Sequence, residues 1–207
     1  MMYYLGIIST GMSLVGNSYA IISELVKHYG YIAIFTLMLL EGSSIPVPSE
    51  VILPLTGLFA RQGLLNIYLG VFAALLGSIG GLAIDYYIGY FIGKDVVYKH
   101  LQAFHITKES LDSFDRWFER NGIAAVFISR LIPALRTVMS FPAGFAKMPQ
   151  KKFFAYSIAG SLIWDSVLAA YGYYALSSTN AVILMASIGI FALVLYAIYA
   201  AAKKYMK

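Results

Sequence analysis

Long apolar stretches alternate with short polar segments along this chain, and some of the apolar stretches are long enough to cross a membrane. Residues 62–93 contain a single charged residue, Asp85, and residues 153–202 contain a single one, Asp165. A helix needs about 20 apolar residues to cross a hydrocarbon core of about 30 Å. The first stretch therefore predicts one transmembrane helix. The second predicts two, at about 153–176 and 181–202.

Another apolar region is interrupted near its middle by proline and charge. Residues 28–40 and 51–60 are each too short to cross a membrane, and the segment between them reads E-G-S-S-I-P-V-P-S-E. Proline removes a backbone donor and restricts the residue before it, so a helix stops there. The pattern predicts a helix–break–helix hairpin over about 28–61 that enters the membrane and returns to the same side. Such a break must be buried in protein or line a wet cavity.

The same organisation recurs over about 121–147, where R-L-I-P-A-L-R separates two short apolar segments. Aligning the two hairpins places Pro46 over Pro133 and Gly57 over Gly144. The span after each hairpin also contains Gly-x4-Asp, which ends at Asp85 in one case and at Asp165 in the other. We infer an internal repeat. Repeats of broken helices in opposite orientations commonly frame a central transport site.

Composition agrees with a membrane protein. Of the 207 residues, 60% are hydrophobic and 12% charged, and the mean hydropathy is +0.74, whereas a soluble domain is about 45–50% apolar and about 25% charged. We therefore predict an all-α integral membrane protein with two inverted re-entrant hairpins and three to four transmembrane helices. Its parts are an N-terminal helix (1–27) that spans the membrane or lies in its interface, a central domain (28–180), and a C-terminal transmembrane helix with a basic tail (181–207).

The one hydrophilic stretch, residues 94–120, predicts an amphipathic helix lying in the membrane interface. Thr107 is a plausible N-cap, and apolar residues then recur at helical spacing between charges.

The distribution of basic residues predicts the orientation in the membrane. With a cytoplasmic C-terminus, eleven basic residues of the loops and tail lie inside and only Lys27 and Arg61 lie outside, as the positive-inside rule requires. Basic residues in short loops beside apolar spans do not suggest a nucleic-acid partner.

Six ionisable residues fall within or beside the apolar segments, and they are the candidate functional residues. They are Glu41, Glu50, Asp85, Arg130, Arg136 and Asp165. A charge at the bilayer centre costs about 2.5–3.5 kcal/mol on insertion scales, so such residues face one another or water and usually mark substrate paths or proton relays. A static pairing that pins the hairpins together remains the alternative. Asp165 fits helix packing through hydrogen bonds as well as it fits a functional role.

The two arginines flank Pro133, and each presents a planar fork of donors suited to phosphate. We expect Arg130 and Arg136 to converge on one anionic headgroup. For the carboxylates, the balance between desolvation and a neighbouring arginine sets the pKa, so we expect them to exchange protons. His100 and His105 lack a carboxylate cluster with metal-ligand spacing, and the sequence predicts no metal, no cofactor and no catalytic residue.

Three segments resemble motifs of the DedA family, the SNARE-associated proteins with a VTT domain. E-G-S-S-I-P-V-P-S-E at 41–50 resembles its first motif, an acidic residue followed by P-x-P-x-E. F-I-S-R-L-I-P-A-L-R-T at 127–137, followed by A-G-F-A-K-M at 143–148, resembles its F-x-R-x-x-P-x-x-R block. G-G-L-A-I-D-Y-Y-I-G at 80–89 is similar to a third, but Ile84 stands where a glycine is usual, as Ser49 does before Glu50.

The resemblance covers about residues 28–180 and implies a function. Members of the family have two inverted re-entrant hairpins and are implicated in moving lipids between leaflets, either polyprenyl phosphates such as undecaprenyl phosphate or phosphatidylethanolamine, often with the proton motive force. Carried over to this chain, the motifs imply that Arg130, Arg136, Glu41 and Glu50 bind the lipid phosphate headgroup. Glu41, Glu50 and Asp85 would exchange protons.

We therefore predict a flippase in the plasma membrane of a prokaryote. Three alternatives remain at this point: an energy-independent scramblase, a membrane scaffold, and a lipid phosphatase, which would need a nucleophile beside the arginines. The lipid, the energy source, the oligomeric state (a homo-oligomer included) and a bacterial or archaeal origin are not determined by the sequence.

Overall fold

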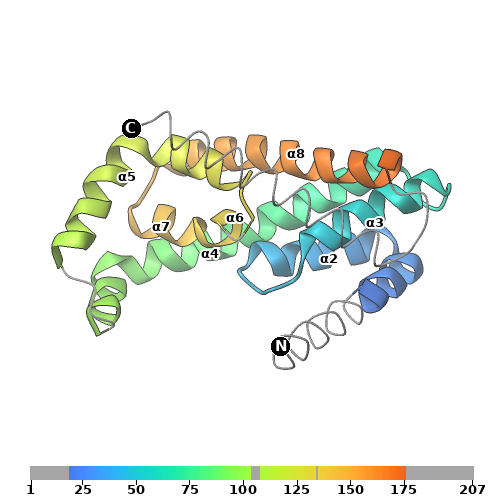
Figure 1. Ribbon diagram of the computed structural model, residues 1–207. Helices are drawn as coiled ribbons and strands as arrows, with labels where there is room; N and C mark the ends of the chain where they lie inside the picture. Colours follow the sequence, from blue (N-terminus) through green and yellow to red (C-terminus); the bar gives the residue numbers. More distant parts are fainter. Residues whose placement is uncertain (1–18, 104–107, 134, 176–207) are drawn as a thin grey trace, which may run out of the picture. The chain divides into compact units, whose positions relative to one another are not determined.

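The computed structural model describes residues 19–103, 108–133 and 135–175, and these residues form helices and turns without a strand (Figure 1). Residues 19–29 are helical. The helices that follow are α2 (Tyr31–Gly42), α3 (Ser49–Arg61), α4 (Ile67–Ala103), α5 (Lys108–Ser129), α6 (Leu135–Val138), α7 (Ser140–Phe145) and α8 (Gln150–Ala175). The predicted all-α class is confirmed. The predicted span at 181–202, Thr107 and residues 1–18 lie outside the described residues.

Within the described residues, two helices are long and apolar enough to cross a membrane: Ile67–Ile92 within α4, and α8. At 1.5 Å per residue, 26 residues reach about 39 Å, more than the hydrocarbon core requires. Much of the apolar surface of α4 is not covered by protein: Tyr68 is 82% exposed and Phe91 is 80% exposed. Ile84 is also on this exposed surface.

Both predicted helix breaks are present. The first lies between α2 and α3, where Ser44 adopts a left-handed backbone (φ 57°) and Pro46 and Pro48 follow. The second follows α5, where the chain turns at Arg130–Pro133 before the short helices α6 and α7. The pattern of helix, break and helix is therefore confirmed in both regions, whereas the membrane depth of these hairpins stays a prediction.

The hydrophilic stretch differs from the expectation of one separate interfacial helix. Helix α4 continues to Ala103, and α5 runs without interruption from Lys108 through Gly122 to Ser129. The predicted amphipathic helix and the first arm of the second hairpin are thus one helix. A single glycine inside a helix costs only about 1 kcal/mol and removes no hydrogen bond, so Gly122 does not end α5.

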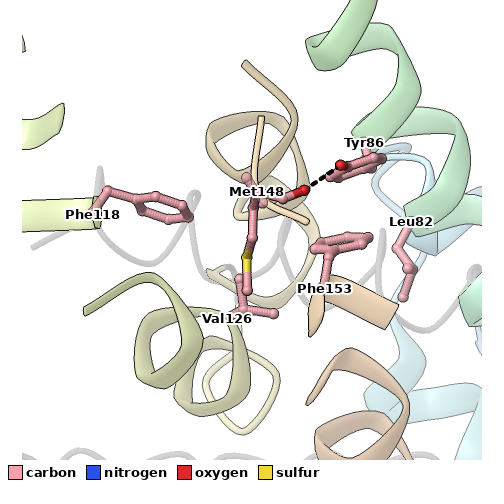
Figure 2. Packing of buried hydrophobic residues seen from close by; sticks show 7 residues of the cluster. Leu82, Tyr86, Phe118, Val126, Met148 and Phe153 are labelled. Atoms are coloured by element: carbon pink, nitrogen blue, oxygen red, sulfur yellow. Dashed lines mark hydrogen bonds between the residues drawn. The ribbon is translucent and has the colours of Figure 1, made fainter. Parts of the chain in front are cut away.

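The described residues form two compact units, to both of which α4 and α8 contribute. Unit 1 contains residues 19–34, 48–73 and 167–175, and unit 2 contains 35–47 and 74–166. The apolar core of unit 2 joins α4, α5 and α8 to the turn after α7, and Figure 2 shows its side chains. Tyr86 stacks on Phe153 at 4.4 Å between ring centroids, and its hydroxyl donates a hydrogen bond to the Met148 carbonyl at 2.5 Å.

Glycines let helices of unit 2 approach to backbone contact. A Cβ on Gly77 or Gly81 of α4 would collide with carbonyl oxygens of α2, and further along α4 a Cβ on Gly89 would lie 2.7 Å from the carbonyl oxygen of Phe141. From the other side, a Cβ on Gly144 of α7 would collide with the Tyr86 carbonyl. Helix α4 therefore packs closely against both α2 and α7, the two segments that carry or adjoin the predicted site residues.

Unit 1 contains the corresponding contact. Gly57 of α3, which the repeat alignment pairs with Gly144, packs against the backbone of Ala169 in α8, and Gly172 of α8 packs against the backbone of Pro54. Each of the two paired glycines thus contacts the long helix of the opposite repeat. Gly57 contacts α8 shortly after Asp165, and Gly144 contacts α4 shortly after Asp85. Small residues at such contacts are typical of helix packing in membranes.

Candidate functional site

Five of the six candidate ionisable residues are buried in unit 2. Glu41, Asp85, Arg130, Arg136 and Asp165 are each no more than 5% exposed. Charged side chains are almost never fully buried unless they are paired. Their arrangement therefore decides what the site can do.

Arg136 and Glu41 form a two-point ion pair. Nε of Arg136 lies 3.2 Å from Oε1 of Glu41, and Nη2 donates to Oε2 at 3.3 Å. Glu41 stands in the last turn of α2, which the glycine contacts hold against α4, and Arg136 is the second residue of α6. This parallel fork geometry is the strong form of an arginine–carboxylate contact.

Asp165 of α8 is the second carboxylate at Arg136. Its Oδ1 lies 3.7 Å from Nη2 of Arg136, and neither of its carboxylate oxygens has a hydrogen-bond partner among the described residues. The indole ring of Trp164 lies 5.5 Å from the guanidinium carbon of Arg136. One guanidinium is therefore shared between two buried carboxylates from different helices.

Arg130 has a different environment, made of neutral groups. Nη1 donates to the backbone carbonyl of Arg136, Nη2 donates to the Ser140 hydroxyl at 3.0 Å, and the guanidinium lies 5.7 Å from the ring of Phe153. Space for the side chain comes from Gly160 of α8, where a Cβ would stand 2.7 Å from Cβ of Arg130. No carboxylate of the described residues forms an ion pair with Arg130.

Asp85 contacts the first helix break. Its Oδ2 accepts a hydrogen bond of 2.5 Å from the hydroxyl of Ser44, the residue with the left-handed backbone. The segment of the first helix break is thus attached to α4 within its apolar span. Glu50, by contrast, lies in unit 1, half-buried in the first turn of α3, so its predicted share in the site stays a prediction.

Sequence reasoning left Asp165 undecided between helix packing and a functional role, and it did not single out Ser44 or Ser140. A signal for Asp165 was present: its Gly-x4-Asp segment matches the one that ends at Asp85. Gly160 of that segment makes room for Arg130, and Asp165 lies beside Arg136. The two serines had no such signal, because serine is common in turns and neither serine belongs to a charged motif.

Comparison with known proteins identifies a family. The VTT domain model matches residues 47–174. Undecaprenyl phosphate transporter A of Staphylococcus aureus is 36% identical over 73% of this chain and 77% of its own length. An alkaline phosphatase-like protein of Lactococcus lactis subsp. lactis is 32% identical over 73% of each chain. Protein DedA of Escherichia coli is 27% identical over 74% of this chain and 73% of its own length.

No solved structure matches the chain. The family model covers more than half of the residues, and its extent includes Glu50, Asp85, both arginines and Asp165. The two apolar helices α4 and α8 fit a protein of the membrane. The chain belongs to the DedA family of VTT-domain membrane proteins.

Proposed function

We propose that this protein is a flippase that moves a phosphate-bearing lipid, a polyprenyl phosphate or a phospholipid such as phosphatidylethanolamine, between leaflets in exchange with protons. A relative named as an undecaprenyl phosphate transporter supports the substrate class. The observation that carries the proposal is a pair of buried guanidinium N–H groups, Nε of Arg130 and Nη1 of Arg136, which have no hydrogen-bond partner among the described residues.

Unpaired buried donors are costly, about 1–3 kcal/mol each and more for charged groups. The two donors belong to arginines that are already joined, because Arg130 donates to the carbonyl of Arg136. A phosphate group presents several acceptor oxygens and binds guanidinium groups in a fork geometry. A headgroup phosphate between the two arginines would satisfy both donors at once.

The two arginines would contribute differently. Arg130 has only neutral partners, so its charge is available to an anion without displacing a carboxylate. Arg136 already binds Glu41 through two contacts, so the phosphate must compete with Glu41 for it. This competition supplies a physical reason for coupling, because a proton on the carboxylate weakens its hold on the arginine.

The charge balance of the buried groups also supports coupling between phosphate binding and proton uptake. The five buried groups comprise two arginines and three carboxylates, so the fully ionised cluster carries a net charge of −1. A phosphate monoester adds about −1.5 to −2 near neutral pH, and uncompensated charge is costly in a buried site. Proton uptake by Glu41 or Asp165 would compensate, and Asp85 is the third candidate. The positive-inside count supports a cytoplasmic C-terminus for the transporter.

The proposal is tested with the full-length protein in proteoliposomes that contain a polyprenyl phosphate, using an assay that reports its leaflet. Arg130→Lys and Arg136→Lys keep the charge but lose the planar fork, so each should slow transport by about 10- to 150-fold, equivalent to about 1.5–3 kcal/mol for one charged hydrogen bond. The control is Arg116→Lys, an exposed arginine whose partner is Ser113. Wild-type rates in both folded lysine variants would refute the phosphate site.

The same liposomes test proton coupling. Glu41→Gln and Asp165→Asn should each make transport independent of an imposed pH gradient, because the neutral amide cannot exchange the proton. Wild-type transport that ignores the gradient would favour a scramblase instead. Phosphate release from the lipid would favour the phosphatase reading that one relative's name suggests, with Ser140 beside Arg130 as the hydroxyl to examine first.

A further inference from the structure

Unit 2 contains a cavity of about 250 Å³ that is separate from the buried arginine site. It lies between the middle of α5 and the turn that joins α7 to α8. It shares no lining residue with the buried cluster, by which we mean Glu41, Asp85, Arg130, Arg136 and Asp165. We call it the basic pocket, because three of its lining residues are the cations Arg120, Lys147 and Lys152. Glu119 is the one acidic lining residue, so the ionised lining carries a net charge of +2.

The cations of the basic pocket are exposed and available. Arg120, Lys147 and Lys152 are all on the surface, and none of them forms an ion pair with another described residue. The ammonium of Lys147 lies 5.9 Å from the centroid of the Tyr90 ring. Like charges that a protein places together attract anions from outside.

The pocket is amphiphilic, since apolar side chains complete its wall. Phe118 and Met148 are buried core residues whose packing is seen in Figure 2, and Ile123 is partly exposed. Outside the pocket, α5 carries further exposed apolar side chains, Trp117 at 48% and Ile128 at 52%. A ligand with a charged head and an apolar chain would therefore find a partner surface for each end.

The wall that carries Lys147 is rigidly built. Lys147 has a left-handed backbone (φ 53°), held by hydrogen bonds from its own N–H to the Gly144 carbonyl and from the Met148 N–H to the Ala143 carbonyl. The Met148 carbonyl in turn accepts the hydroxyl of Tyr86 on α4. A non-glycine residue keeps this conformation only where surrounding structure holds it in place. The direction of Lys147 is thus set by the fold of α7 and α4.

We infer that the basic pocket binds the phosphate monoester head of a lipid at the membrane surface, before or after its passage through the buried site. A phosphate monoester carries about −1.5 to −2 near neutral pH, which matches the net charge of the lining. The ligand class rests on the proposed function, but the pocket is a second site with its own residues. A free phosphate group shares the same head chemistry, so the experiment separates the two sources.

The test measures binding directly, without transport. The chain has two tryptophans, and Trp117 lies directly before the lining residue Phe118. In a Trp164→Phe background, Trp117 becomes the only tryptophan and reports ligand at the pocket. The full-length protein is placed in nanodiscs of phosphatidylcholine with or without phosphatidic acid, a lipid phosphate monoester, and inorganic phosphate is titrated as competitor.

We expect phosphatidic acid to change the Trp117 emission and inorganic phosphate to reverse the change. Arg120→Ala and Lys152→Ala should each weaken the response by about fivefold or more. Their matched controls, Arg116→Ala on the same helix and Lys151→Ala beside Lys152, are exposed cations outside the lining and should behave like the parent. Equal losses in the controls would show a diffuse surface charge and overturn the pocket. A response to inorganic phosphate without one to phosphatidic acid would overturn the lipid ligand.

Failure of this inference is distinguishable from failure of the proposed function. Arg136→Lys should leave the Trp117 response unchanged, because Arg136 does not line the pocket. If Arg136→Lys also transports at the wild-type rate while the pocket variants lose the response, only the buried phosphate site is refuted. If transport depends on Arg136 while the pocket variants bind normally, only the pocket is refuted.

Discussion

The buried cluster and the basic pocket hold the same kinds of side chain in opposite conditions. In the cluster, the guanidinium of Arg136 is shared by Glu41 and Asp165, and all three residues are buried. In the pocket, Arg120, Lys147 and Lys152 are exposed and outnumber the single carboxylate. Burial accounts for the difference, because desolvated charges must be paired whereas solvated charges need no partner.

From this difference we expect ligand binding and protein stability to be coupled in the buried cluster and independent in the basic pocket. An anion that binds Arg136 in the cluster competes with Glu41 for the same guanidinium, so binding there changes protonation and packing together. An anion that enters the pocket replaces only water and counter-ions. Substitutions should therefore affect folding strongly in the cluster and weakly in the pocket.

The largest effect is expected for Arg136→Ala, which leaves the carboxylates of Glu41 and Asp165 buried without their cation. Removing one partner of a buried ion pair costs about 3–5 kcal/mol. Thermal unfolding of the purified protein in detergent should show a large fall in Tm, and Arg136→Ala with Glu41→Ala should recover part of it. Arg120→Ala in the pocket should change the free energy of unfolding by less than about 0.5 kcal/mol. Similar Tm values for Arg136→Ala and Arg120→Ala would contradict the expected difference in stability between the cluster and the pocket.

A smaller effect is expected for Ser44→Ala, which removes the hydrogen bond to the buried Asp85. A hydrogen bond to a charged group contributes about 1.5–3 kcal/mol. The neighbouring Ser43→Ala is the control, because the Ser43 hydroxyl, directly after α2, donates to the nearby carbonyl of Leu39 and not to a buried carboxylate. Ser44→Gly separates the loss of the hydrogen bond from the strain of the left-handed backbone. Glycine also lacks the hydroxyl, but it accepts that backbone without strain. Equal Tm values for Ser43→Ala and Ser44→Ala would show that Asp85 does not need this contact.

A small effect of opposite sign is expected for Lys147→Gly in the basic pocket. Glycine adopts the left-handed backbone of this position without strain, at a cost in chain entropy, so the free energy of unfolding should rise by about 0.5 kcal/mol. Anion binding at the pocket should fall at the same time, because a cation is lost. Lys151→Gly, in the first turn of α8, should instead lower the free energy of unfolding by about 0.5–1 kcal/mol. A destabilised Lys147→Gly variant would mean that its side chain contributes more than its charge.

The sequence by itself determined the class of protein, both helix breaks, the span at α8 and the family. The class, the breaks and the span follow from local features, because apolar length sets a span and proline sets a break. The family follows from the motif residues. Local features also misled. The polar segment was expected to be a separate helix, but α5 passes through Gly122 because nothing there removes a backbone hydrogen bond.

Only the tertiary structure decided which charges are partners. The sequence predicted that Arg130 and Arg136 act alike, yet one is paired with carboxylates and the other with neutral groups. Glu41 and Arg136 are 95 residues apart, and their contact depends on α2 packing closely on α4 through Gly77 and Gly81. Asp165 reaches Arg136 only because of where α8 lies. Such contacts depend on the rotation and spacing of packed helices, which side-chain periodicity along one segment does not contain.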